Sequence, residues 1–143
     1  MLYIAPLFWL GRPVRRFGYA DDIAILAISK DLQDNCNNLQ ADAQEALDWG
    51  QAEGITFDPK KSELIHFTRS MRDPPAASSP SITAGTYVIQ EATGPLRWLG
   101  VFFDRKLSFK PHVRILAAKA LTVSNALRSL GKTTRGVSPI FLQ

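Results

Sequence analysis

The stretch FGYADDIAIL, from Phe17 to Leu26, places two adjacent carboxylates between two apolar runs. Val14 to Tyr19 and Ile23 to Ile28 are rich in β-branched and aromatic residues, which is typical of short strands. The pattern therefore predicts a β-hairpin that turns at Asp21 and Asp22. Side chains alternate between the two faces of a strand, but at a tight turn both carboxylates can be presented near one edge.

The adjacent aspartates have a chemical use and an ordinary alternative. Like charges in contact repel one another unless a cation lies between them. Mg²⁺ takes one or two carboxylates and fills its remaining positions with water and phosphate oxygens. A carboxylate pair on a rigid hairpin is therefore suited to two-metal phosphoryl transfer. Aspartate is also among the commonest turn residues, so a plain polar turn is the alternative.

Length and composition narrow the class of protein. The chain has 143 residues, of which 45% are hydrophobic and 21% charged, so we expect one compact globular unit and not a disordered segment. Its longest apolar stretches are too short to span a bilayer, so no membrane partner is expected. Cys36 is the single cysteine, which excludes an internal disulfide. His66 and His112 are isolated in the sequence, so a histidine-built metal site is not expected.

Charge is unevenly distributed along the chain. Residues 31–53 contain six acidic residues and no basic one, whereas residues 105–143 contain eight basic residues and no acidic one. A basic tail on a mixed body is the charge pattern expected of a contact with a polyanion. A basic helix face exposed to solvent is the alternative.

The apolar spacing predicts three helices and several strands. One helix is expected at Met1–Leu10, one follows Asp31 as its N-cap, and one runs from Phe109 to Leu130. The second helix has an apolar face with steps of three and four, formed by Leu32, Cys36, Leu39, Ala43, Leu47 and Gly50. Gly131 is expected to end the third helix. Further strands are expected at Ser62–Thr68, Thr86–Ile89 and Leu96–Asp104, and Arg69–Ser81 reads as a surface loop. The predicted class is α+β, an antiparallel sheet with helices on one face, followed by a basic helical appendix.

Four motifs in order resemble the reverse transcriptases (RNA-directed DNA polymerases) of non-LTR, or long interspersed, retrotransposons. FGYADDIAIL is similar to the family's central polymerase motif, and LYIAPLF (Leu2 to Phe8) to the helix after its Gln-Gly-Ser-Pro segment. GITFDPKKSELIHF (Gly54 to Phe67) is similar to the lysine-bearing motif. LRWLGVFFDRKLSFKPHV (Leu96 to Val113) is similar to the primer grip and the entry to the thumb. The resemblance implies that residues 1–104 are the C-terminal part of a polymerase palm and that residues 105–143 begin the thumb.

The resemblance also implies roles for individual residues. Asp21 and Asp22 would bind the catalytic Mg²⁺ or Mn²⁺ ions. Lys61 would act on the departing pyrophosphate, although Lys60 is adjacent and either could simply be solvated. Tyr19 would lie by the primer end or the nucleotide, or it is only a strand aromatic. The primer grip would be formed by Trp98, Leu99 and Gly100, although a glycine inside a strand is also a common bulge.

The implied reaction is attack of a DNA primer's 3′-hydroxyl on a dNTP, templated by RNA, with nuclear action implied by the family alone. The family's active site also needs an earlier aspartate and a fingers region, and neither is found in these 143 residues. We therefore expect a polymerase fragment that is inactive alone. The alternatives are a non-catalytic nucleic-acid-binding remnant and a structural domain whose aspartates only form a turn.

Overall fold

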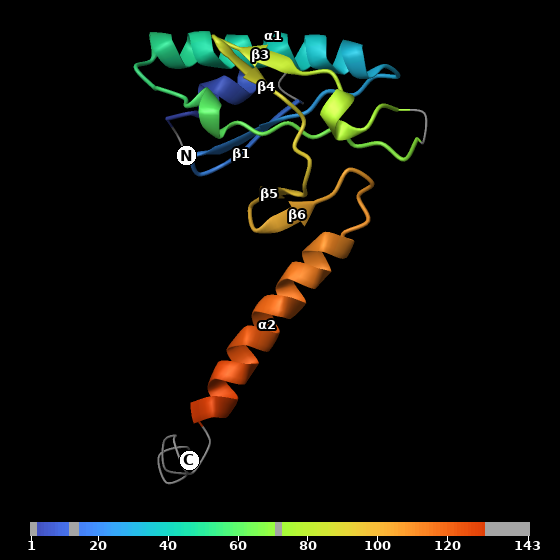
Figure 1. Cartoon of the computed structure of the whole chain (residues 1–143). Helices are drawn as coiled ribbons and strands as arrows, with labels where there is room; N and C mark the ends of the chain where they lie inside the picture. The colour runs from blue at the N-terminus through green and yellow to red at the C-terminus, as the bar shows by residue number, and fades with distance from the viewer. Residues whose placement is uncertain (1–2, 12–14, 71–72, 131–143) are drawn as a thin grey trace.

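The computed structural model describes residues 3–11, 15–70 and 73–130. In Figure 1, α1 (Leu32–Ala52) lies along one side of a body, and α2 (Lys110–Leu130) projects away from it. The strands within the described ranges form three separate two-stranded antiparallel sheets. The predicted α+β class is confirmed, but one continuous antiparallel sheet is not seen in these ranges.

The first hairpin is formed by β1 (Arg16–Tyr19) and β2 (Asp22–Ile25), as the sequence predicts. Tyr19 pairs with Asp22, so Ala20 and Asp21 form a two-residue loop. Ala20 has a φ of 55°, and a positive φ at this position is typical of the primed turns that join tightly paired strands. The carboxylate pair therefore lies at the tip of a hairpin.

Helix α1 also follows the prediction. The Asp31 side chain accepts a hydrogen bond from the Gln33 amide at 2.8 Å, which satisfies one of the donors left free at a helix N-terminus. Gly54, just past the C-terminal end, has a φ of 73°. The apolar face of α1 packs on β3 (Ile82–Ala84), which pairs with β4 (Tyr87–Ile89). The resulting core contains Cys36, Leu64, Ile82, Ala84 and Ile89, with Leu39, Ala43 and Leu47 packed against it.

Two elements differ from the prediction. The helix expected at Met1–Leu10 is a short 3₁₀ helix, η1 (Ala5–Trp9), with proline in its first turn; Met1 and Leu2 lie outside the described residues. The strand expected at Ser62–Thr68 is reduced to one parallel bridge, between Leu64 and Glu91. Its polar groups find other partners, because the His66 amide donates to the Glu91 carboxylate and the Thr68 amide to the Arg105 carbonyl.

The strand expected at Leu96–Asp104 is instead a hairpin of β5 (Leu96–Trp98) and β6 (Val101–Phe103). Leu99 and Gly100 form its turn with φ values of 48° and 82°. The glycine supplies one left-handed residue without strain, whereas the leucine adopts that conformation at an energetic cost. The other short 3₁₀ helices of the described ranges are η3 (Pro59–Lys61) and η4 (Ala76–Ser78).

Helix α2 begins one residue later than predicted and follows a loop organised by Asp104. The Asp104 carboxylate accepts hydrogen bonds from the amides of Ser108, at 3.1 Å, and Phe109, at 2.8 Å. The helix contacts β6 at its N-terminal end. Gly131, the predicted stop, lies outside the described residues. None of the helices in the described ranges is both long and apolar enough to cross a membrane.

Candidate functional site

The two aspartates of the candidate site lie at the tip of the β1–β2 hairpin and are both exposed. Asp21 is the second loop residue, and Asp22 is the first residue of β2. The predicted turn is therefore present, one residue earlier than predicted, because its loop is Ala20 and Asp21 and Asp22 already pairs with Tyr19. Because the loop has only two residues, both carboxylates are held close to the same end of the ribbon.

One face of the same hairpin carries exposed aromatic rings. Phe17 and Tyr19 alternate with Arg16 and Gly18 along β1, and their side chains are 46% and 62% exposed. Tyr19 pairs across the ribbon with Asp22, so the tyrosine and this carboxylate occupy one face. Tyr19 was expected beside the reacting groups. Phe17 extends the aromatic surface away from the turn.

Arg16 anchors the hairpin to the body, a role that was not predicted from the sequence. Its side chain is fully buried, with one guanidinium nitrogen donating to the carbonyls of Leu7 (3.2 Å) and Leu10 (2.7 Å). The other nitrogen donates to the Asp42 carbonyl at 3.2 Å and to the Glu45 carboxylate. Arg16 thus joins β1, η1 and α1. The signal in the sequence was an arginine at an inward-facing position of a strand.

Gly18 has a packing role in the same hairpin. A Cβ atom built on Gly18 would come within 2.1 Å of the Phe8 ring, so η1 lies directly against this part of β1. Real Cβ atoms do not approach other atoms so closely, so any other residue at this position would require the Phe8 ring to shift. The glycine in FGYADD lets an aromatic ring support the strand that leads to the aspartates.

The donors at the hairpin tip fit a hard divalent cation. Asp21 and Asp22 supply carboxylate oxygens in a solvent-exposed position, which suits Mg²⁺ because this ion keeps several waters and accepts phosphate oxygens. Among the described residues, no cluster of three or more His, Cys, Asp or Glu side chains is arranged to hold a metal ion. The described residues therefore supply two carboxylates at this position and no third ligand of these types.

The lysine motif lies on another element, η3. Asp58 caps this turn by accepting from the Lys60 amide at 3.0 Å. Both lysines are exposed, and the Lys60 ammonium lies over the Tyr87 ring, 5.5 Å from its centroid. The two lysines therefore have different surroundings. The contact with the Tyr87 ring is made by the ammonium of Lys60 and not by that of Lys61.

The residues expected in the primer grip lie at the turn of the β5–β6 hairpin. Trp98 is the last residue of β5 and pairs with Val101, and Leu99 and Gly100 form the loop between them. Figure 1 shows this hairpin between the body and α2, apart from β1. The structure thus places the expected site residues on three different elements, and it brings Tyr19, Asp21 and Asp22 together on one of them.

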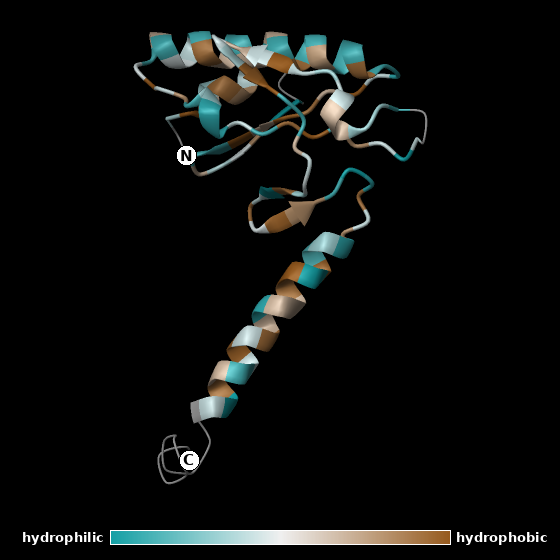
Figure 2. Cartoon of the chain, viewed as in Figure 1, coloured by the Kyte–Doolittle hydropathy of each residue, from teal (hydrophilic) through white to brown (hydrophobic). Residues whose placement is uncertain are grey.

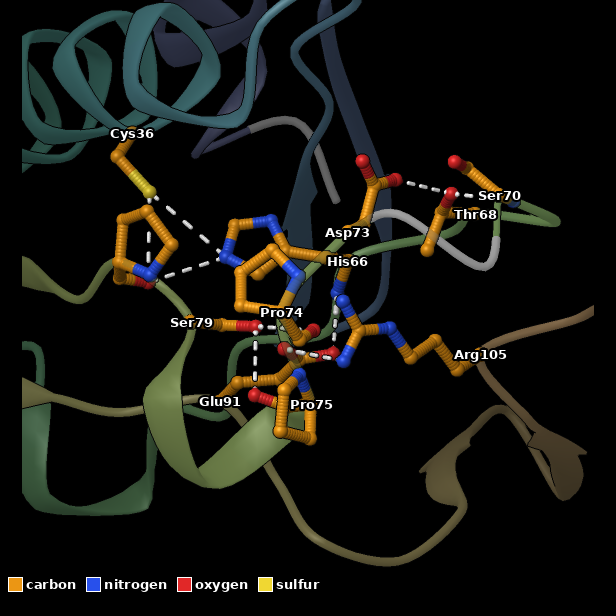
Figure 3. Close-up of polar contacts among 11 residues, drawn as sticks. Cys36, His66, Thr68, Ser70, Asp73, Pro74, Pro75, Ser79, Glu91 and Arg105 are labelled. Atoms are coloured by element: carbon orange, nitrogen blue, oxygen red, sulfur yellow. Dashed lines mark hydrogen bonds and ion pairs between the residues drawn. The ribbon is translucent and has the colours of Figure 1, made fainter.

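A second polar cluster, drawn in Figure 3, lies in the core and not at the candidate site. Cys36 Sγ is 3.7 Å from His66 Nε2, and both contact the Pro80 carbonyl, at 3.5 and 3.1 Å. Desolvation, together with the negative charge of Glu91, raises the pKa of the Cys36 thiol. The thiol is therefore protonated at neutral pH, and the cluster serves to satisfy buried polar atoms.

The chain is similar to RNA-directed DNA polymerases of mobile elements. It is 29% identical over 98 residues to the RNA-directed DNA polymerase from mobile element jockey of Drosophila funebris, a match that covers 68% of this chain and 10% of that protein. It is 28% identical over 99 residues to the probable RNA-directed DNA polymerase from transposon X-element of Drosophila melanogaster, covering 66% and 10%. The resemblance to polymerases of non-LTR retrotransposons is therefore confirmed.

This similarity concerns a small part of each relative, since the chain spans about a tenth of the length of the curated relatives it matches. No protein-family model matches the chain, and no solved structure matches it.

Proposed function

We propose that this chain is the part of an RNA-directed DNA polymerase that presents the aspartate pair Asp21 and Asp22 and begins the thumb. The observation that supports this most directly is the exposed Asp21–Asp22 pair at the tip of a tight hairpin, in a chain similar to mobile-element polymerases. Both carboxylates would hold Mg²⁺ or Mn²⁺. When bound, such an ion supplies positive charge for nucleotide transfer to a primer 3′-hydroxyl.

The other proposed roles use the chain's own side chains. Tyr19 shares a face with Asp22 and would contact the sugar or base of the primer end or the incoming dNTP. The exposed ammonium of Lys61 would offset negative charge on the leaving pyrophosphate. The turn at Trp98, Leu99 and Gly100 would let a primer backbone approach, because a glycine presents no side chain. An RNA template paired with the DNA primer is the implied partner.

We further propose that the 143-residue polypeptide does not polymerise by itself. Two carboxylates are a minimal donor set, and the described residues offer no third acidic, histidine or cysteine ligand beside them. Catalysis in phosphoryl transfer is mostly positioning and charge neutralisation, so an incomplete clamp leaves little rate enhancement. A primer-extension assay with Mg²⁺ checks this, and processive synthesis by the purified chain would overturn it.

A second candidate function is nucleic-acid binding without catalysis. It is favoured by the eight basic residues, with no acidic one, between Arg105 and Gln143. Contacts between such residues and phosphates would be insensitive to base sequence and would weaken steeply with salt. Titration of the chain with a primer-template duplex distinguishes this function, because an affinity unchanged from about 50 to 200 mM salt contradicts it.

Metal binding at the hairpin tip can be tested without activity. We expect added Mn²⁺ to broaden the amide NMR signals of residues 20–23 before those elsewhere. Asp21→Asn and Asp22→Asn should each reduce this broadening strongly, because each removes an anionic ligand. Asp48→Asn is the matched control, since Asp48 is an exposed carboxylate on α1. Equal broadening in Asp21→Asn and the unmodified chain would refute the metal site.

A further inference from the structure

The outer edge of the β3–β4 hairpin is occupied by two glutamines of α1. In the described ranges β3 pairs only with β4, so its other edge has no strand beside it. The Thr83 amide donates to the side-chain carbonyl of Gln40 at 3.0 Å. The Gly85 amide, just past the end of β3, donates to that of Gln44 at 3.3 Å. Side-chain oxygens therefore take the place that the carbonyls of an added strand would occupy.

The register of the hairpin explains why these amides face outward. Residues opposite each other in an antiparallel pair alternate between hydrogen-bonded and non-hydrogen-bonded pairs. Ala84 pairs with Tyr87 at the two-residue turn and closes the ladder there. Thr83 is therefore in a non-hydrogen-bonded pair, and its amide points away from β4. Gly85, two residues further on, presents its amide to the same helix.

The spacing of the glutamines matches the spacing of the amides. Gln40 and Gln44 are four residues apart on α1, which is a rise of about 6 Å. Thr83 and Gly85 are two residues apart, which is about 6.8 Å along a strand. Both pairs run in the same chain direction, so each glutamine meets one amide. The Gln44 side-chain nitrogen donates to the Asp48 carboxylate at 2.8 Å, which leaves its carbonyl facing Gly85.

The two glutamines lie on the hydrophilic side of an amphipathic helix. Hydrophobic and hydrophilic bands alternate along α1 in Figure 2, and its apolar residues pack on β3. Both glutamines and Gly85 are exposed, and Thr83 is half-buried. Water could therefore reach these amides, so the glutamines are not required to satisfy buried donors. What they add is occupation of a strand edge that could otherwise pair with another chain.

We propose that Gln40 and Gln44 guard the β3 edge against strand addition by a second copy of this chain. An unpaired strand edge is a template for another strand, and a second copy carries the same edge. Two β3 strands could then pair with each other only after the glutamine side chains had left the Thr83 and Gly85 amides. This inference depends neither on the proposed polymerase function nor on the metal site.

The guard can be tested in the 143-residue chain by combining Gln40→Ala with Gln44→Ala. We expect hydrogen exchange of the Thr83 and Gly85 amides to become about threefold to tenfold faster, because each amide loses one hydrogen bond. We also expect sedimentation velocity to show a larger fraction of dimers and higher oligomers than in the unmodified chain, because the edge is open.

Two further variants separate the guard from other effects. Gln33→Ala combined with Gln51→Ala removes two exposed glutamines from the same helix, and it should change neither the exchange rates nor the association. Thr83→Pro, added to the Gln40 and Gln44 double variant, removes an outward-facing amide without removing a bond to β4. It should return the association to the level of the unmodified chain.

Several results would overturn the proposal. Unchanged exchange at Thr83 and Gly85 in the double variant would show that the glutamines do not hold these amides. Association no greater than in the Gln33 and Gln51 control, or association that persists with Thr83→Pro, would show that the β3 edge is not what they protect. Circular dichroism shows whether each variant keeps its helices. Should the double variant unfold, Gln40→Glu decides, because its carboxylate still accepts a hydrogen bond and the exchange protection of Thr83 should remain.

Discussion

Arg16 is the residue on which the position of the aspartate hairpin depends most. Burying an arginine is costly unless its donors find partners, and here the two terminal nitrogens donate to main-chain carbonyls of Leu7, Leu10 and Asp42 and to the Glu45 carboxylate, while Nε has no partner. Removing the guanidinium takes one donor away from each of these acceptors. Arg16 therefore holds the hairpin that carries the turn at Asp21 and Asp22 against η1 and α1.

We predict that Arg16→Ala lowers the free energy of unfolding by about 3 kcal/mol or more, because it breaks a buried network. Urea denaturation of the 143-residue chain measures this. Arg16→Lys should recover only part of the loss, because an ammonium cannot reproduce the fork of donors. Arg114→Ala is the control: Arg114 is an exposed residue of α2, so we expect a loss below about 1 kcal/mol. Similar losses for both alanine variants would contradict the anchoring role of Arg16.

At the scale of elements, the loop between β6 and α2 depends on the charge of one carboxylate. Desolvation tends to raise the pKa of Asp104, but hydrogen bonds from Ser108 and Phe109 outweigh it, so this pKa lies below its usual value. A lowered folded-state pKa means that the carboxylate stabilises the loop above the pKa of the unfolded chain, about 3.9. The stabilisation is lost as the pH falls through the lower, folded-state pKa.

We therefore predict that the Ser108 and Phe109 amides lose their hydrogen-bonded NMR shifts as the pH falls below about 4. Asp104→Asn keeps an acceptor oxygen but cannot titrate, so its amide shifts should not show this step. Comparing the two proteins at each pH removes the effect of acid on the rest of the chain. A step of equal size in both proteins would show that Asp104 is not its cause.

Element by element, the sequence predicted what local rules determine. Both α1 and α2 could be predicted because their apolar residues recur at steps of three and four. The first hairpin could be predicted because two apolar runs flank a polar turn. The hairpin at Leu96–Asp104 was missed because its turn includes Leu99 at a positive φ, a conformation that propensity rules assign to glycine or asparagine. Ser62–Thr68 was predicted as a strand because its pattern is apolar, yet its hydrogen bonds go to Glu91, Ala92 and Arg105.

The candidate site also has a part that could be predicted from the sequence and a part that could not. Asp21, Asp22 and Tyr19 are contiguous, so their common position could be predicted from the sequence. The support of Arg16 could not, because its partners at Leu7, Leu10, Asp42 and Glu45 are brought to it only by tertiary packing. The roles proposed for Lys61 and Trp98 stay predictions that rest on motif resemblance.

At the scale of the whole molecule, one buried ion pair helps to connect the body to the segment that carries α2. Glu91, buried in the body, accepts from the His66 amide at 3.1 Å and pairs with Arg105 at 3.3 Å (Figure 3). The Arg105 carbonyl accepts from the Thr68 amide at 2.9 Å, and the Phe103 ring lies at the edge of Phe67. Arg105 lies two residues after the end of β6 and five residues before the start of α2, so these contacts hold the segment from which α2 projects.

We predict that Glu91→Gln loosens this connection, because an amide can still accept from His66 but leaves the partly buried Arg105 guanidinium without its counter-charge. Urea denaturation should show a loss of about 1–3 kcal/mol. Spin labels at Ala41→Cys on α1 and Asn125→Cys on α2 should give a wider distance distribution in the variant. The native thiol does not interfere, since Cys36 is buried and its pKa is raised by desolvation. Glu63→Gln is the control, because Glu63 is exposed and lies next to Leu64, the bridge partner of Glu91. It should leave both the free energy of unfolding and the distance distribution unchanged. If Glu91→Gln and Glu63→Gln give the same distribution, the ion pair does not hold α2 in place.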